Sequence, residues 1–241
     1  MSALVIAMAC TAASSARAQP NPEQGRLNAK AGPPTSRGPL GLQPLGLGPD
    51  RDGLRYVPAS YKPERPMPVV LALHGAGSAG SRSISRLIAF ADLLGFIIIA
   101  PDSRGATWDV LRGGFGFDVL FIGDALRQTF AQYNVDTTHI AIAGFSDGAS
   151  YALSLGQMNG DLFSSIIAFS PGFQRVIKAY GHPRIYVAHG TRDEILNIDR
   201  TSRVMVPQLR ALGYTVDYRE FDGPHSWSPE VVREAVVWFL K

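Results

Sequence analysis

The residues with the clearest chemical potential form a short motif around Ser146. The motif Gly144-Phe145-Ser146-Asp147-Gly148 follows an apolar run and precedes a segment with helical spacing. A serine in a Gly-x-Ser-x-Gly turn between a strand and a helix is typical of an activated nucleophile, because the tight turn exposes its hydroxyl. A glycine-rich turn with a chance serine is the alternative interpretation. We favour the first, and the motif then predicts covalent acyl transfer through Ser146.

A serine nucleophile needs a base, and His225 is the best placed of the five histidines. It lies in a loop after the last predicted strand, and it follows a carboxylate, Asp193, just beyond the preceding strand. We expect Asp193 to hold the His225 imidazole in the tautomer that accepts the serine proton. His189 is expected to be structural, in the turn that aims Asp193. The other acidic candidates are Glu194, Asp199 and Asp222.

Backbone N–H groups near Ser146 are the candidates for stabilising an oxyanion. The N–H of Asp147 lies at the start of the predicted helix, where a developing negative charge is favoured. The second donor is expected from the loop His74–Ser78, which follows the apolar run Val69–Leu73. We expect this donor to be the N–H of Ala76, with Gly75 as the neighbouring alternative.

The same loop contains Gly-x-Gly-x-x-Gly over residues 75–80, and Asp102 follows the next strand. Together they resemble a dinucleotide-binding fingerprint. His74 displaces the first glycine from the end of the strand, and this interpretation leaves Ser146 and His225 without a role. We therefore do not favour NAD binding.

Alternating apolar runs and amphipathic segments must position these residues. Short apolar runs rich in β-branched residues predict strands over residues 69–73, 96–100, 139–143, 165–169, 184–188 and 215–221. The segments between them predict helices over residues 83–94, 118–133, 149–157, 202–212 and 229–240. This alternation predicts the α/β class, with a mainly parallel twisted sheet and helices on both faces. Ligands of such sheets bind outside the carboxyl ends of the strands, where the candidate residues fall.

Composition narrows the classes of function. The chain has 241 residues, 46% of them hydrophobic, and a net charge of +3, which suits a globular protein with a core. The excess positive charge lies in residues 1–48, so no basic patch on the remainder predicts a nucleic-acid partner. Cys10 is the single cysteine, which excludes an intramolecular disulfide and a cysteine-rich zinc site. No run reaches the ~18 apolar residues of a membrane span.

The first 50 residues differ from the rest. Residues 1–18 resemble a signal peptide, with an apolar stretch from Leu4 to Ala13 and a small-x-small site at Ala16-Arg17-Ala18, but they lack a basic start. They favour a secreted or periplasmic protein, or a cytoplasmic one if they are no signal. Residues 19–50 are rich in Pro and Gly and predict a disordered linker. Residues 51–241 are then the catalytic domain.

The motifs together resemble a known family. They are similar to the phospholipase/carboxylesterase branch of the α/β-hydrolases, and also to polyhydroxybutyrate-depolymerase-like and feruloyl-esterase-like enzymes. The resemblance covers roughly residues 53–240. The motifs that carry it are Leu73-His74-Gly75-Ala76-Gly77, Ala100-Pro101-Asp102-Ser103-Arg104-Gly105, Thr107-Trp108-Asp109, Gly144-Phe145-Ser146-Asp147-Gly148-Ala149-Ser150, Phe169-Ser170-Pro171-Gly172-Phe173, His189-Gly190-Thr191-Arg192-Asp193 and Gly223-Pro224-His225.

The resemblance implies a carboxylic-ester hydrolase that needs no metal or organic cofactor and acts on a small or polymeric ester. It assigns the catalytic triad to Ser146, His225 and Asp193. The short segment between residues 169 and 188 leaves no space for a large cap domain, which predicts an open site. The candidates for the substrate pocket, each of which burial alone would also explain, are Trp108, Phe173, Leu196 and Trp227.

Other functions share this pattern. A thioesterase or a serine peptidase of the same fold would use the same residues, and a non-catalytic pseudo-hydrolase would keep the fold as a binding scaffold. The presence of all three triad residues argues against the scaffold. The length of the acyl group, the nature of the alcohol and the oligomeric state stay open.

Overall fold

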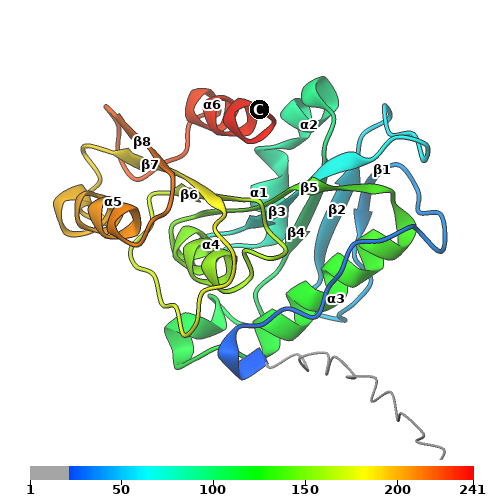
Figure 1. Cartoon of the computed structure of the whole chain (residues 1–241), viewed down its shortest axis with the longest axis horizontal. Helices are drawn as coiled ribbons and strands as arrows, with labels where there is room; N and C mark the ends of the chain where they lie inside the picture. Colours follow the sequence, from blue (N-terminus) through cyan, green and yellow to red (C-terminus); the bar gives the residue numbers. More distant parts are fainter. Residues whose placement is uncertain (1–21) are drawn as a thin grey trace, which may run out of the picture.

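An eight-stranded sheet forms the centre of this computed structural model, which describes residues 22–241 (Figure 1). The strand order is β1-β2-β4-β3-β5-β6-β7-β8. β1 and β2 form an antiparallel edge, and β3 to β8 all run parallel. The strands are β1 (Gly41–Pro44), β2 (Gly53–Val57), β3 (Met67–Leu73), β4 (Ile97–Pro101), β5 (Val135–Phe145), β6 (Ser165–Phe169), β7 (Arg184–Gly190) and β8 (Val216–Phe221).

Helices cover both faces of this sheet, as the sequence predicts. The helices are α1 (Gly80–Ser85), α2 (Ile88–Leu94), α3 (Phe117–Gln132), α4 (Asp147–Met158), α5 (Ser202–Ala211) and α6 (Pro229–Phe239). Short 3₁₀ turns are η1 (Pro22–Gln24), η2 (Asp109–Arg112) and η3 (Ile198–Arg200). α3, α4 and α5 pack on one face, and α1, α2 and α6 pack on the other (Figure 1). The α/β class with a mainly parallel sheet is confirmed.

Burial explains why the central strands form. Every residue of β4 and β6 is buried, as expected for strands covered by helices on both faces. On α3, Val119, Ile122, Leu126 and Phe130 recur at helical spacing, and all four are buried against the sheet. These apolar side chains pack the helices against the sheet. The polar candidate residues lie at the ends of the strands that this packing holds in place.

The predicted helix over residues 83–94 is two helices in the structure. α1 ends at Ser85 and α2 begins at Ile88, so the chain turns between them. Both helices bury apolar residues against the same face of the sheet. The apolar spacing therefore continues from one helix to the next and resembles that of a single longer helix. Gly95 ends α2 with a φ of 76°, a left-handed conformation that glycine adopts without strain.

Residues 22–50 are not the disordered linker that their composition predicts. Gly41–Pro44 forms the edge strand β1, where a proline is tolerated because its missing N–H faces away from the ladder. Leu27 and Leu45 are buried in the core formed with α3 and α4. The folded domain therefore begins well before residue 51. The predicted signal peptide, residues 1–18, lies outside the described residues.

Side chains of the domain hold this N-terminal segment in place. The buried Asn159 amide donates to the Gly25 carbonyl at 2.8 Å and accepts from the Leu27 N–H at 2.9 Å. The Arg26 guanidinium forms two hydrogen bonds with the Asp161 carboxylate. The few apolar residues of the segment thus pack into the core of the domain, and the domain satisfies polar groups of the segment's backbone. The Pro and Gly content of the segment does not predict these contacts.

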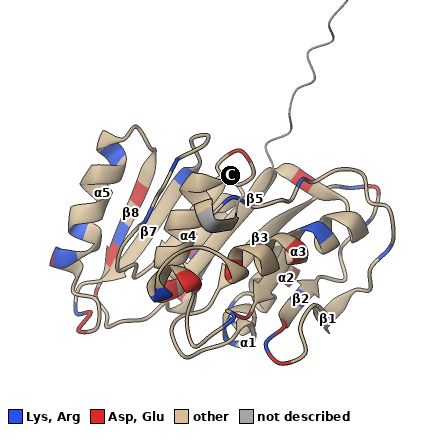
Figure 2. Ribbon diagram, turned by 90° about the horizontal axis from the view of Figure 1, so that it is seen from below, with Lys and Arg blue, Asp and Glu red and all other residues tan. Residues whose placement is uncertain are grey.

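Charged residues of both signs are interspersed along the ribbon in the view of Figure 2. Within residues 22–241, no helix is long and apolar enough to cross a membrane. In the same part of the chain, no group of three His, Cys, Asp or Glu side chains is arranged to hold a metal ion.

Candidate active site

Ser146 lies on a strained turn between β5 and α4. Its φ of 58° and ψ of −121° place a non-glycine residue in a rarely populated conformation. The two flanking glycines allow this turn. A Cβ on Gly144 would lie 2.1 Å from the Gly148 carbonyl oxygen, and one on Gly148 would lie 2.4 Å from the Leu73 carbonyl oxygen. The backbone packing of β5, α4 and β3 thus requires glycine on both sides of the serine.

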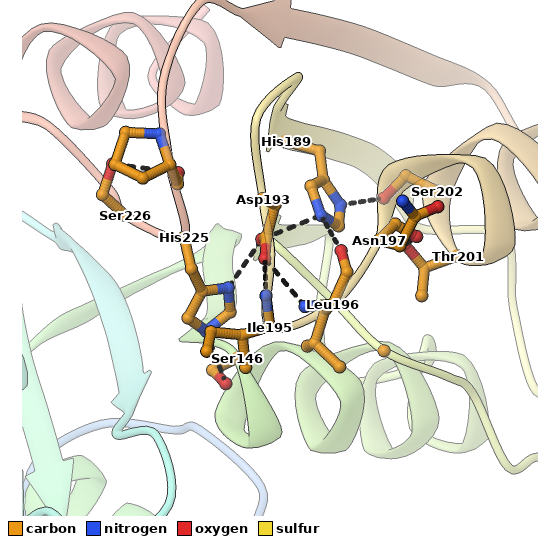
Figure 3. A network of polar contacts seen from close by, with 12 residues as sticks. Ser146, His189, Asp193, Ile195, Leu196, Asn197, Thr201, Ser202, His225 and Ser226 are labelled. Atoms are coloured by element: carbon orange, nitrogen blue, oxygen red, sulfur yellow. Dashed lines mark hydrogen bonds and ion pairs between the residues drawn. The ribbon is translucent and has the colours of Figure 1, made fainter.

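Ser146, His225 and Asp193 form a continuous chain of hydrogen bonds (Figure 3). His225 Nε2 lies 2.9 Å from Ser146 Oγ, and His225 Nδ1 lies 2.6 Å from Asp193 Oδ2. Because the carboxylate can only accept, Nδ1 carries a proton and Nε2 is free to accept the serine proton. The three residues come from loops after β5, β7 and β8, at one edge of the sheet.

The second carboxylate oxygen of Asp193 is held by the backbone. The N–H groups of Ile195 and Leu196 donate to Oδ1 at 2.9 and 2.7 Å. Burial acts to raise the pKa of Asp193, but hydrogen bonds from the Leu196 N–H and from His225 outweigh it and lower this pKa. Asp193 is therefore ionised and fixed in orientation. Glu194, an alternative acid, is exposed, and Asp222 pairs with Arg192.

His189 is a second histidine on the same carboxylate (Figure 3). Its Nε2 lies 3.0 Å from Asp193 Oδ2 and 2.8 Å from the Leu196 carbonyl oxygen, and its Nδ1 lies 2.7 Å from Ser202 Oγ. Burial lowers the pKa of His189, so the ring is neutral at pH 7. Nε2 faces two acceptors and carries the proton, and Nδ1 accepts from the serine hydroxyl.

The expected oxyanion donors lie on two sides of Ser146. Asp147 is the first residue of α4, so its N–H has no acceptor within the helix. Gly75 lies so close to the nucleophile that a Cβ on it would be 3.4 Å from Ser146 Cβ. Its neighbour Ala76 is exposed, and among the described residues no backbone hydrogen bond uses the Ala76 N–H. Both predicted segments therefore border the serine.

The loop of residues 103–108 holds the oxyanion segments in place. The Ser103 N–H donates to His74 Nε2 at 2.9 Å, and the His74 Nδ1–H donates to the Gly75 carbonyl at 2.7 Å. Burial lowers the pKa of His74, which agrees with this neutral ring. The Thr107 hydroxyl donates to the Asp147 carboxylate at 2.6 Å.

Trp108 belongs to this support and not to the pocket. Its side chain is fully buried, its Nε1–H donates to the His74 carbonyl at 2.8 Å, and its ring stacks on Tyr151. The expectation that Trp108 lines the acyl or alcohol pocket does not hold in the structure. Packing decides its position, because a large aromatic ring with one donor fills the space behind the His74 loop.

A cavity of about 510 Å³ opens beside the nucleophile. Of the pocket candidates, Trp227 lines it and stacks on Phe145, which in turn contacts the His225 ring. Phe173 and Leu196 are not among its lining residues. Leu196 instead packs on Gly172. Sequence reasoning did not identify Ile195, Arg82 and Arg86, which line the cavity but belong to no recognisable motif.

The fold is similar to that of solved esterase and hydrolase structures. The structure of FphF, a fluorophosphonate-binding serine hydrolase of Staphylococcus aureus, superposes with a TM-score of 0.67 at 15% sequence identity. The match covers 85% of this chain and all of FphF. The fold is that of the α/β-hydrolases. Within this domain, residues 119–229 match the model of the Esterase family.

Two curated relatives are esterases. The bifunctional acetylxylan esterase/xylanase XynS20E of Neocallimastix patriciarum is 27% identical over 157 residues, which cover 62% of this chain and 22% of that protein. Feruloyl esterase B of Neurospora crassa is 31% identical over 111 residues, which cover 42% of this chain and 38% of that enzyme. The chain thus spans well under half the length of these curated relatives.

Proposed function

We propose that this α/β-hydrolase is a carboxylic-ester hydrolase that forms an acyl-enzyme on Ser146. One observation carries the proposal: the unbroken hydrogen-bond chain from Ser146 Oγ through His225 to Asp193, on a strained turn beside a cavity. The match of residues 119–229 to the Esterase family and the esterase relatives favour an ester over other acyl substrates.

The reaction follows from the positions of the protons. Ser146 Oγ attacks the ester carbonyl carbon while His225 Nε2 takes the hydroxyl proton, and Asp193 stabilises the imidazolium that forms. The N–H groups of Asp147 and of Ala76 or Gly75 stabilise the oxyanion of the tetrahedral intermediate. His225 returns the proton to the leaving alcohol, which leaves an acyl group on Ser146. Water, deprotonated by His225, then attacks the acyl carbon, and Ser146 Oγ leaves with the proton that His225 returns, which releases the acid and restores the free serine.

The test is the hydrolysis of p-nitrophenyl acetate, butyrate and octanoate by the purified full chain and by Ser146→Ala. We expect the variant to lose about 10⁴ or more in kcat, because triad residues act as a unit. Ser36→Ala, which removes an exposed serine hydroxyl, is the matched control and is expected to retain wild-type rates. Methyl ferulate and acetylated xylan, added as further substrates, compare this chain with its relatives.

A fluorophosphonate probe separates the alternatives. Covalent labelling of Ser146, read as a mass increase that Ser146→Ala lacks, would exclude the non-catalytic scaffold. Turnover of thioester or peptide substrates with no turnover of oxygen esters would favour a thioesterase or a peptidase instead. An inert protein that is not labelled would contradict the proposed function. Export of the protein stays a prediction from residues 1–18.

A further inference from the structure

The cavity beside Ser146 carries positive charge. The only Lys or Arg residues among its lining residues are Arg82 and Arg86, and no Asp or Glu of residues 22–241 lines it. The lining also includes the imidazoles of His74 and His225. The other lining residues are apolar or carry hydroxyl or backbone groups, and they are Gly75, Ala76, Ser78, Ser83, Phe145, Ser146, Ile195, Ser226, Trp227 and Ser228. Both arginines are exposed, so their guanidinium groups are accessible to a ligand in the cavity.

The two arginines are close neighbours on one element. Arg82 lies in α1, and Arg86, four positions later, is the C-cap residue that follows this helix. Residues four apart lie on the same side of a helix, and two like charges at this spacing destabilise it slightly. α1 has no acidic residue in its first turn, and within the described residues neither side chain forms an ion pair or hydrogen bond. An anion would remove this repulsion.

Ser83 provides an independent indication. Its side chain is fully buried and lines the same cavity, yet its hydroxyl has no hydrogen-bond partner among the described residues. Buried hydroxyls without a partner are rare in native proteins, and a polar group of a ligand is one explanation. Ser83 lies between the two arginines in sequence and lines the same cavity as they do.

We propose that Arg82, Ser83 and Arg86 form a subsite for a carboxylate of the substrate, and that the substrate class is esters that carry a free carboxylate. The inference rests on the proposed function. A carboxylate fits this donor set, because a guanidinium fork binds its two oxygens in one plane and a hydroxyl occupies a remaining lone pair. Phe145 and Trp227 offer apolar surface for the rest of the molecule.

The experiment compares esters that differ in one charge. In the first pair, 4-acetoxybenzoate carries the carboxylate on the alcohol side, and its methyl ester is the neutral counterpart. In the second pair, monoethyl adipate carries the carboxylate on the acyl side, and ethyl hexanoate is the neutral counterpart. We expect the wild-type protein to prefer the charged member of at least one pair by about tenfold in kcat/KM. This preference should shrink in 0.5 M NaCl, because salt screens charges near the surface.

Variants assign the preference to the subsite. Arg82→Gln and Arg86→Gln should each lower kcat/KM for the charged ester about threefold to tenfold, and the double variant should remove the preference, with the neutral ester changed less than about twofold. Ser83→Ala should weaken the preference about threefold. Arg233→Gln removes the same charge from an exposed position on α6 outside the cavity and should leave the preference unchanged.

Turnover of neutral esters without any preference for the charged member of either pair would overturn the subsite alone. Equal losses on charged and neutral esters in the arginine variants would also overturn it, since a structural role predicts that result. Failure of the wild-type protein on every ester would instead contradict the proposed function.

Discussion

Asp193 is shared by two histidines, and only one of them faces the nucleophile. His225 and His189 both contact Oδ2, at 2.6 and 3.0 Å, and two N–H groups occupy Oδ1. The His189 ring is anchored on its other side by Ser202. His189 therefore limits the directions in which the carboxylate can point, and through it the direction of the His225 ring.

Replacing His189 by Leu should weaken this orientation without touching the reacting atoms. We expect kcat to fall about tenfold with KM little changed, and the free energy of unfolding to fall by about 1–3 kcal/mol, because Ser202 and the Leu196 carbonyl lose a buried partner. Ester kinetics and urea denaturation measure the two effects. His182→Leu, at an exposed histidine, is the control. A stability loss with unchanged kcat would show that His189 only fills space.

The order of residues along the chain was sufficient to predict that Ser146, Asp193 and His225 lie together, as they do in the structure. It was not sufficient for Trp108, because the sequence does not show that its Nε1–H meets the His74 carbonyl, 34 positions away. The positions of Arg82 and Arg86 at the cavity were also not predictable, because no sequence pattern distinguishes them from other exposed arginines. Motifs carry the reacting groups, whereas the residues that support or surround them depend on tertiary contacts.

Among the elements, the turn between β5 and α4 has little tolerance for added side-chain atoms. Gly148→Ala would bring a Cβ within 2.4 Å of the Leu73 carbonyl and 2.5 Å of the His74 carbonyl, so backbone must move. We expect a loss of about 3 kcal/mol or more, or failure to fold, since overpacking against backbone is poorly relieved. Gly114→Ala, where a Cβ meets nothing within 4 Å, should stay close to wild type. Thermal unfolding of both variants measures this, and equal stability would contradict it.

Elements with a clear apolar pattern were the predictable ones. Residues 165–169 form β6 with the expected bounds, and the spacing on α3 marks its buried side. The split between α1 and α2 and the strand β1 were not predictable, for a common reason. Both depend on how a polar or glycine-rich segment packs against or pairs with the rest of the sheet, and local composition does not predict such tertiary contacts.

For the molecule as a whole, two buried neutral histidines predict a loss of stability in mild acid. Burial lowers the pKa of both His74 and His189 below 6.5. Below pH about 6.5 the unfolded chain binds protons that the folded protein does not, so the free energy of unfolding falls as the pH falls. Asp193, whose pKa is also lowered, contributes a further loss only below pH about 4.

Urea denaturation at pH 8, 7, 6 and 5 checks this. We expect little change between pH 8 and 7 and then a decline of at most about 1.4 kcal/mol per pH unit for each histidine. The decline should be shallower in His189→Leu than in wild type. A free energy of unfolding that stays constant down to pH 5 would contradict the assignment of neutral rings.

The N-terminal segment also determines how the isolated domain should be produced. β1 pairs with β2 from Gly41↔Val57 to Pro44↔Leu54 and covers the outer edge of the sheet. A recombinant protein that begins at Arg51, where composition suggests the boundary, would keep the predicted triad but leave β2 with a row of unpaired N–H and C=O groups. Such an open edge is a template for pairing with a second chain, so aggregation during purification is the expected consequence of trimming there.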